Sequence, residues 1–209
     1  MDDRSRPRNR YVTRHRRMVL VHRHLTTRLA ETFRWIDPGP ESTHLVSDTS
    51  GWWRDPEILA RIGPELAEPF RAKRPTVVVA PEVTGFLLGP LVAVALGVGF
   101  VPAYKNVGDR RIADRTVWAA TGPDYRQRRL ALGFRERHVR AGDRVLLVDD
   151  WVDTGAQLLA LHGLVIAQGA EPVGAAAIVA DCPLAVRQHL RLRALLTPDD
   201  LPDLPAETI

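Results

Sequence analysis

The sequence predicts an α/β domain in which a parallel, twisted sheet is flanked by helices. From residue 76 onward, short and wholly apolar stretches alternate with longer segments of helical character. Because these stretches lack the polar alternation of a half-exposed strand, we expect strands that are buried on both faces, as in parallel sheets. Strands that alternate with helices form βαβ units, so the connections should be right-handed crossovers.

The amino-terminal region is expected to contain a short amphipathic helix and then a second helix. Apolar residues recur there at every fourth position: Leu25, Leu29 and Phe33. This helix should end before the loop at residues 37–40. Asp55 has the features of an N-cap, with Pro56 as the first helical residue. We expect the helix that follows to be interrupted or kinked at Gly63 and Pro64.

The region after residue 76 should contain four strands and two helices. The predicted strands are Val77–Ala80, Phe100–Tyr104, Val145–Val148 and Val173–Val179. The predicted helices are Phe86–Leu96, which Gly97 ends, and Thr154–Gln168, which Gly169 ends. About 40 residues separate the second and third strands, far more than a crossover needs. In this interval, Arg129–Leu132 alternates as an edge strand does.

Composition and charge limit the classes of protein. A chain of 209 residues with 45% apolar and 26% charged side chains suits one globular domain with a small additional segment. The sole cysteine, Cys182, cannot form an intrachain disulfide, and we expect a cytoplasmic protein. The uncharged stretch Val83–Tyr104 contains several glycines and prolines, so we expect a buried helix, a turn and a strand and no membrane span.

Positive charge is concentrated at the amino terminus. Nine arginines against Asp2 and Asp3 give residues 1–28 a charge of +7, which leaves −3 for the remainder. We therefore divide the chain into a basic extension at residues 1–40, with a short helix, and a domain at residues 41–209. Such an extension can bind nucleic acid, but we favour a solvated segment.

The segment from Val145 to Gln157 carries the clearest chemical signal. An apolar strand ends in Asp149 and Asp150, and a turn of small residues then opens a helix. The start of a helix presents unpaired N–H groups to a phosphate, and Thr154 adds a hydroxyl. The two carboxylates can accept hydrogen bonds from the hydroxyls of a ribose, although they could instead cap the helix. The pattern predicts a sugar-phosphate site.

This segment resembles the phosphoribosyl-pyrophosphate signature of type I phosphoribosyltransferases. Three further stretches are similar to adenine phosphoribosyltransferases: Asp48–Pro56, Ala80–Gly89, and Ala95–Pro102 with Lys105. The resemblance extends from about Ser47 to Val179. It implies the type I phosphoribosyltransferase fold, in which Asn106–Asp124 forms a flexible hood over the site. It also implies a homodimer and transfer of 5-phosphoribosyl from phosphoribosyl pyrophosphate to a purine, with adenine favoured.

The resemblance assigns roles to particular residues. Asp149 and Asp150 would bind the ribose and contact Mg²⁺ indirectly, through substrate and water. The 5′-phosphate would be bound by Asp153, Thr154, Gly155, Ala156 and Gln157. The pyrophosphate would face Val83, Thr84 and Lys105, and the base would contact the segment from Leu45 to Ser47. Lys105 and Asp153 are the catalytic candidates.

Several departures from the adenine enzymes leave alternatives open. Thr84 replaces an arginine, and Ala156 with Gln157 replaces a Gly-Thr pair. Asp153 stands where 6-oxopurine phosphoribosyltransferases have an aspartate that faces N7 of the purine, so a 6-oxopurine substrate is possible. Asp153 could otherwise be the N-cap of a helix beginning at Thr154. The alternative function is a non-catalytic regulator that senses phosphoribosyl pyrophosphate and binds nucleic acid through its basic arm.

Overall fold

The main sheet of the computed structural model has seven strands, and the structure describes residues 24–39, 45–106, 114–122 and 130–203. The strand order is β5-β6-β4-β3-β7-β8-β9. The strands are β3 (Val77–Pro81), β4 (Gly99–Lys105), β5 (Thr116–Ala120), β6 (Ala131–Arg135), β7 (Arg144–Val152), β8 (Glu171–Ala180) and β9 (Leu192–Leu196). The five strands from β4 to β9 in this order pair in parallel, which confirms the predicted parallel sheet and adds β9 to it, whereas β6 and β5 are antiparallel.

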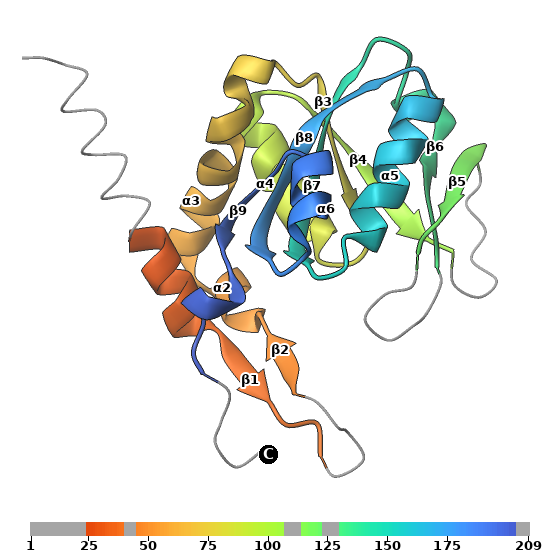
Figure 1. The fold of residues 1–209 in the computed structure, drawn as a ribbon. Helices are drawn as coiled ribbons and strands as arrows, with labels where there is room; N and C mark the ends of the chain where they lie inside the picture. The colour runs from red at the N-terminus through yellow and green to blue at the C-terminus, as the bar shows by residue number, and fades with distance from the viewer. Residues whose placement is uncertain (1–23, 40–44, 107–113, 123–129, 204–209) are drawn as a thin grey trace, which may run out of the picture.

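Helices cover both faces of this sheet (Figure 1). The helices are residues 24–32, α2 (Ser50–Arg54), α3 (Pro56–Ala67), α4 (Gly85–Leu96), α5 (Ala156–Ala167) and α6 (Leu184–His189), with short 3₁₀ turns at η1 (Glu68–Lys73), η2 (Glu136–His138) and η3 (Pro198–Asp200). One apolar core lies under α3 and α4, and the other lies under α5. Val78 of β3 faces the first core and Val79 faces the second, so this strand is buried on both faces.

The third predicted strand ends later than expected. The sequence suggested an end at Val148, but β7 continues in register with β8 to Val152. Asp149 and Asp150 therefore lie within the strand, near its carboxyl end, and not in a loop. The ladder continues because β8 is long enough to supply hydrogen-bond partners as far as Ala180.

The predicted edge strand at Arg129–Leu132 was placed wrongly. The observed strand is β6, which lies between β4 and β5 and is therefore not at the edge. Its side chains Leu132 and Phe134 are fully buried, which suits an inner position. The edge is β5, and it falls within the stretch predicted to be a hood. Residues 107–113 and 123–129, which include the remainder of that hood, lie outside the described residues.

The second helix was predicted to be interrupted or kinked; the interruption is wrong, and the kink stays a prediction. α3 runs unbroken through Gly63 and Pro64 to Ala67. An interior proline costs about 3 kcal/mol, but the helix buries Ile58, Ile62 and Leu66, which are worth about 1.5–3 kcal/mol each. Packing thus outweighs the lost hydrogen bond.

The amino-terminal helix is part of the main core. Leu25, Leu29 and Phe33 are fully buried beside the apolar residues of α3, which confirms the predicted amphipathic helix. Trp52 is buried too, and its indole N–H donates to the Leu29 carbonyl at 2.9 Å. Asp55 caps α3 as predicted, since its Oδ1 accepts from the Glu57 amide at 2.8 Å. The domain boundary at residue 40 stays a prediction.

Two features near the site were not predicted. β1 (Arg34–Ile36) and β2 (Val46–Asp48) form an antiparallel pair outside the main sheet, and this pair lies at the lower end of the molecule in Figure 1. α6 follows β8 and leads into β9. In the described part of the chain, no helix is both long and apolar enough to cross a bilayer.

Candidate active site

A cavity of about 410 Å³ lies beyond the carboxyl ends of β4, β7 and β8. This volume is in the range of small-molecule sites. The lining residues are Trp35, Leu45, Val46, Ser47, Lys105, Leu130, Asp149, Trp151, Val152, Asp153, Thr154, Gly155, Ala156, Gln157, Leu158 and Asp181. The position agrees with the expectation that ligands of open α/β sheets bind at this edge.

The turn at residues 153–157 leaves the start of α5 open to a ligand. α5 begins at Ala156, its N-cap is Gly155, and no side chain caps it. The prediction of a helix starting at Thr154 with Asp153 as its N-cap is therefore wrong. The hydroxyl of Thr154 accepts a hydrogen bond from the Ala156 amide at 3.2 Å. The amide groups that follow have no partner within the helix, because they belong to its first turn.

Gly155 explains why the helix starts where it does. Its φ of +76° lies in the left-handed region, which disfavours any residue with a Cβ. A Cβ on Gly155 would also lie 2.4 Å from Cγ1 of Val186 on α6. The short helix α6 thus packs directly on the turn and fixes its position.

Asp149 is a buried carboxyl group in the cavity wall. One of its oxygens accepts a hydrogen bond from the amide of Asp150 at 3.0 Å. Burial raises the pKa of Asp149 well above its ordinary value, and the neighbouring carboxylate of Asp150 raises this pKa further. The ammonium group of Lys105 acts in the opposite direction. The amide of Lys105 in turn donates to Oε2 of Glu82 at 2.9 Å, which ties the end of β4 to the loop after β3.

Aromatic side chains form another wall of the cavity. Trp35 and Trp151 meet edge to face, with ring centroids 6.1 Å apart. Phe33 packs on both of them, at 4.9 Å from Trp35 and 6.0 Å from Trp151. The indole N–H of Trp35 donates to the carbonyl of Pro202 at 2.9 Å, so this ring is fixed.

The structure brings together most of the predicted site residues. Leu45, Ser47, Lys105, Asp149 and all five residues of the turn line one cavity. Asp150, Val83 and Thr84 are not among its lining residues. Val83 is 69% exposed just before α4, and the Glu82–Val83 peptide bond is cis. The individual roles of these residues stay predictions.

Sequence reasoning missed Trp35, Trp151 and Asp181. Trp151 directly follows the two acids, so its position in the signature was a usable signal. Trp35 and Asp181 come from distant parts of the chain, and only the fold places them at the cavity.

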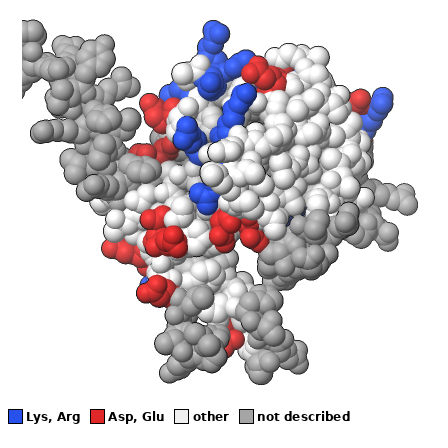
Figure 2. All heavy atoms as spheres, in the orientation of Figure 1, with Lys and Arg blue, Asp and Glu red and all other residues white. Residues whose placement is uncertain are grey.

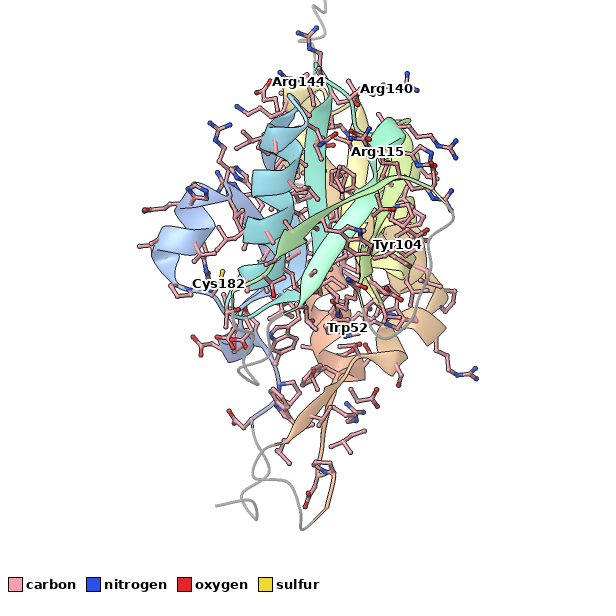
Figure 3. All side chains as sticks on the ribbon, turned by 90° about the vertical axis from the view of Figure 1, so that its right-hand side faces the viewer. Trp52, Tyr104, Arg115, Arg140, Arg144 and Cys182 are labelled. Atoms are coloured by element: carbon pink, nitrogen blue, oxygen red, sulfur yellow. The ribbon has the colours of Figure 1, made fainter. Side chains whose placement is uncertain are left out.

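The lining is rich in carboxylates. It contains Asp149, Asp153 and Asp181, against Lys105 as the only Lys or Arg among the described lining residues. On the face shown in Figure 2, Lys and Arg lie mainly on the upper half. Figure 3 places Arg140 and Arg144 at the upper end of the molecule, well above Cys182, which is the neighbour of Asp181. Arg110 and Arg111 of the predicted hood could replace the arginine that is missing at Thr84, but they lie outside the described residues.

Comparison with known proteins identifies the family. Residues 55–187 match the phosphoribosyl transferase domain. The chain belongs to the phosphoribosyltransferase family. It is 32% identical to adenine phosphoribosyltransferase 3 of Arabidopsis thaliana over 162 residues, which cover 78% of this chain and 86% of the plant protein.

Solved structures of adenine phosphoribosyltransferases have the same fold. The Leishmania tarentolae structure is 29% identical with a TM-score of 0.74, and the match covers 85% of this chain and 89% of that one. A Saccharomyces cerevisiae structure, complexed with an imino-altritol bisphosphate and adenine, is 26% identical with a TM-score of 0.71, covering 83% and 99%. This phosphoribosyltransferase is thus a pentosyltransferase. Neither a 6-oxopurine substrate nor a regulatory role finds support among these relatives.

Proposed function

We propose that this phosphoribosyltransferase transfers the 5-phosphoribosyl group of phosphoribosyl pyrophosphate to adenine, releasing pyrophosphate. The observation that carries the proposal is a single cavity in which a buried carboxyl group, Asp149, stands beside the open start of α5. The match to adenine phosphoribosyltransferases supports adenine as the acceptor.

The 5′-phosphate is assigned to the turn at residues 153–157. Amide groups at the first turn of α5 and the positive end of the helix dipole favour an anion there. Oε1 of Gln157 is buried and has no hydrogen-bond partner among the described residues. Gln157 also lines the cavity, and the NH₂ group of its amide can donate to a phosphate oxygen. This replaces the hydroxyl that adenine enzymes have at the corresponding position.

The ribose is assigned to Asp149, with Asp150 beside it. An ionised carboxylate accepts hydrogen bonds from two adjacent hydroxyls. Without ligand, burial raises the pKa of Asp149 and favours its protonated form. Ribose hydroxyls that donate to the carboxylate favour the ionised form, so binding should lower the pKa of Asp149.

The pyrophosphate is assigned to Lys105, Val83 and Thr84. The lining carries more carboxylate than cationic charge, so a polyphosphate substrate requires a neutralising cation. Among the described residues, no three His, Cys, Asp or Glu side chains cluster as metal ligands. Mg²⁺ would arrive on the pyrophosphate, and Asp149 and Asp150 would hold it indirectly, through substrate and water. When bound, Mg²⁺ offsets the charge of the departing pyrophosphate.

The base is assigned to the space between the aromatic wall and β2. Trp35 and Trp151 offer apolar surface to a purine. β2 pairs with β1 on one side only, so its other edge has backbone groups that can read a base. Leu45 and Ser47 at this strand are the candidates that face the base.

The reaction needs positioning more than covalent catalysis. N9 of adenine forms a bond to C1′ of the ribose while the bond from C1′ to the pyrophosphate oxygen breaks. The proton on N7 must then leave, and we assign its acceptance to Asp153, which lines the cavity. Lys105 stabilises the negative charge that develops on the leaving group.

The test mixes the full-length protein, Mg²⁺, phosphoribosyl pyrophosphate and one nucleobase at a time, and measures nucleotide and pyrophosphate. We expect equimolar AMP and pyrophosphate with adenine. D153N should lower kcat by about 10²- to 10⁴-fold, and D199N, which alters an exposed acid in η3, should not. Absence of product with every base would refute the proposal.

A homodimer and a cytoplasmic location stay predictions. Light scattering and cell fractionation test them directly. Nucleic acid is not favoured as a partner, and the arm to which it was assigned lies in residues 1–23 and just beyond, largely outside the described residues.

A further inference from the structure

Two carboxylates stand side by side where β7 and β8 end. Val152 and Ala180 are the last residue pair in the register of these strands. Asp153 and Asp181 follow them, and both line the cavity. Adjacent parallel strands are about 4.8 Å apart, so the two side chains start from neighbouring positions. The amide of Asp181 also donates to the Val152 carbonyl at 2.8 Å, which closes this end of the sheet.

The backbone on either side of Asp181 is fixed by Arg187. The guanidinium of Arg187 donates to the carbonyl of Cys182 at 3.0 Å and to the carbonyl of Ala180 at 2.6 Å. The Nε and Nη2 groups of Arg187 are thus engaged with backbone carbonyls. Their effect is to hold Asp181 in place at the rim of the cavity.

The side chain of Asp181 is exposed and has no hydrogen bond or ion pair among the described residues. Its backbone is held in position, whereas its carboxylate makes no contact that serves the fold. Because it lies in the wall of the substrate cavity, its partner is most simply a group on the substrate. An ionised carboxylate only accepts hydrogen bonds, so that group must be a donor.

Adenine has a matching pair of donors on one edge. In the tautomer that reacts at N9, N7 carries a proton and the 6-amino group is its neighbour, so both groups donate. Hypoxanthine presents an oxygen in place of the amino group, and an oxygen facing a carboxylate is repelled. We propose that Asp181 is a specificity-determining residue that accepts a hydrogen bond from the 6-amino group while Asp153 faces N7.

This inference rests on the proposed function and extends it to the choice between 6-amino and 6-oxo purines. The alternative for two adjacent carboxylates is a divalent cation, which the same variants can detect. Asparagine at position 181 keeps the size of the side chain and adds an NH₂ donor, which suits a 6-oxo group. D199N is the matched control, since it makes the same change on an exposed acid in η3.

The experiment measures kcat/KM for adenine and for hypoxanthine with wild-type protein, D181N and D199N, at saturating phosphoribosyl pyrophosphate. D181N should lower the value for adenine about tenfold and raise the ratio of hypoxanthine to adenine by a larger factor, whereas D199N should leave both unchanged. The concentration of Mg²⁺ at half-maximal rate should be the same in all three proteins.

An unchanged base ratio in D181N would overturn the inference, and so would a shift confined to the Mg²⁺ requirement. These outcomes differ from failure of the proposed function, in which the wild-type protein itself makes no AMP. A wild-type preference for hypoxanthine would refute both.

Discussion

Replacing Gly155 by alanine should destabilise the protein and weaken phosphoribosyl pyrophosphate binding. The residue has a φ of +76°, and the new Cβ would lie 2.4 Å from Cγ1 of Val186 but 3.7 Å from its Cβ. The positive φ concerns the backbone of the turn, and the 2.4 Å contact concerns the packing of α6. The two effects can be separated, because shortening Val186 to alanine removes the clashing carbon and leaves an ordinary contact distance.

The magnitude follows from these two parts. A residue with a Cβ in the left-handed region costs about 1–2 kcal/mol. Overpacking of one methyl group typically costs about 1–3 kcal/mol. G155A should therefore lower the free energy of unfolding by about 2–5 kcal/mol, and in a V186A background by only the backbone part, about 1–2 kcal/mol.

Urea unfolding of four proteins measures this: wild type, G155A, V186A and the double variant. The coupling free energy between the two sites should be about 1–3 kcal/mol. The KM for phosphoribosyl pyrophosphate should rise in G155A and recover partly in the double variant, because α6 supports the turn assigned to the phosphate. If G155A costs the same in both backgrounds, the close packing of α6 on the turn is not what requires glycine.

Three further outcomes are expected. D149N should be more stable than wild type near neutral pH without ligand, and the difference should vanish as the pH falls to about 4. The reason is that the raised pKa of Asp149, caused mainly by burial, makes ionisation of this carboxyl group unfavourable to the fold. An equal or lower stability of D149N at neutral pH would contradict this. The pKa of His162 is lowered by burial and nearby cationic groups. In thermal melts, wild type should therefore lose stability as the pH falls through and below 6.5. H162Q should lose less stability, and the surface variant H138Q should behave as wild type. G63A should lower the free energy of unfolding by about 1–3 kcal/mol in urea, because a Cβ there would lie 2.4 Å from the carbonyl oxygen of Leu91; an unaltered midpoint would show that α3 and α4 can separate freely.

The parallel sheet was predictable because its strands carry their own signal. β3, β4, β7 and β8 are apolar on both faces, and this pattern depends only on neighbouring residues. β9 was missed because its five residues contain exposed positions and an arginine. β1 and β2 were missed because strands of three residues have too few positions to show a period.

The site was predictable where it is local. The turn at residues 153–157 belongs to one continuous segment, so its acids, hydroxyl and glycine could be recognised together. Trp35 and Asp181 are more than a hundred residues apart and reach the cavity only through tertiary packing. The start of α5 was misplaced because the left-handed conformation of Gly155, which excludes this residue from the helix, cannot be recognised from the sequence.

The most direct test of the central claim is a crystal structure of the protein with AMP and pyrophosphate. The phosphate of AMP should lie against the amides at the start of α5, its ribose hydroxyls at Asp149, and its adenine between Trp35 and β2. A nucleotide bound elsewhere, or bound with its phosphate away from the turn at residues 153–157, would contradict the assignment of this cavity as the active site.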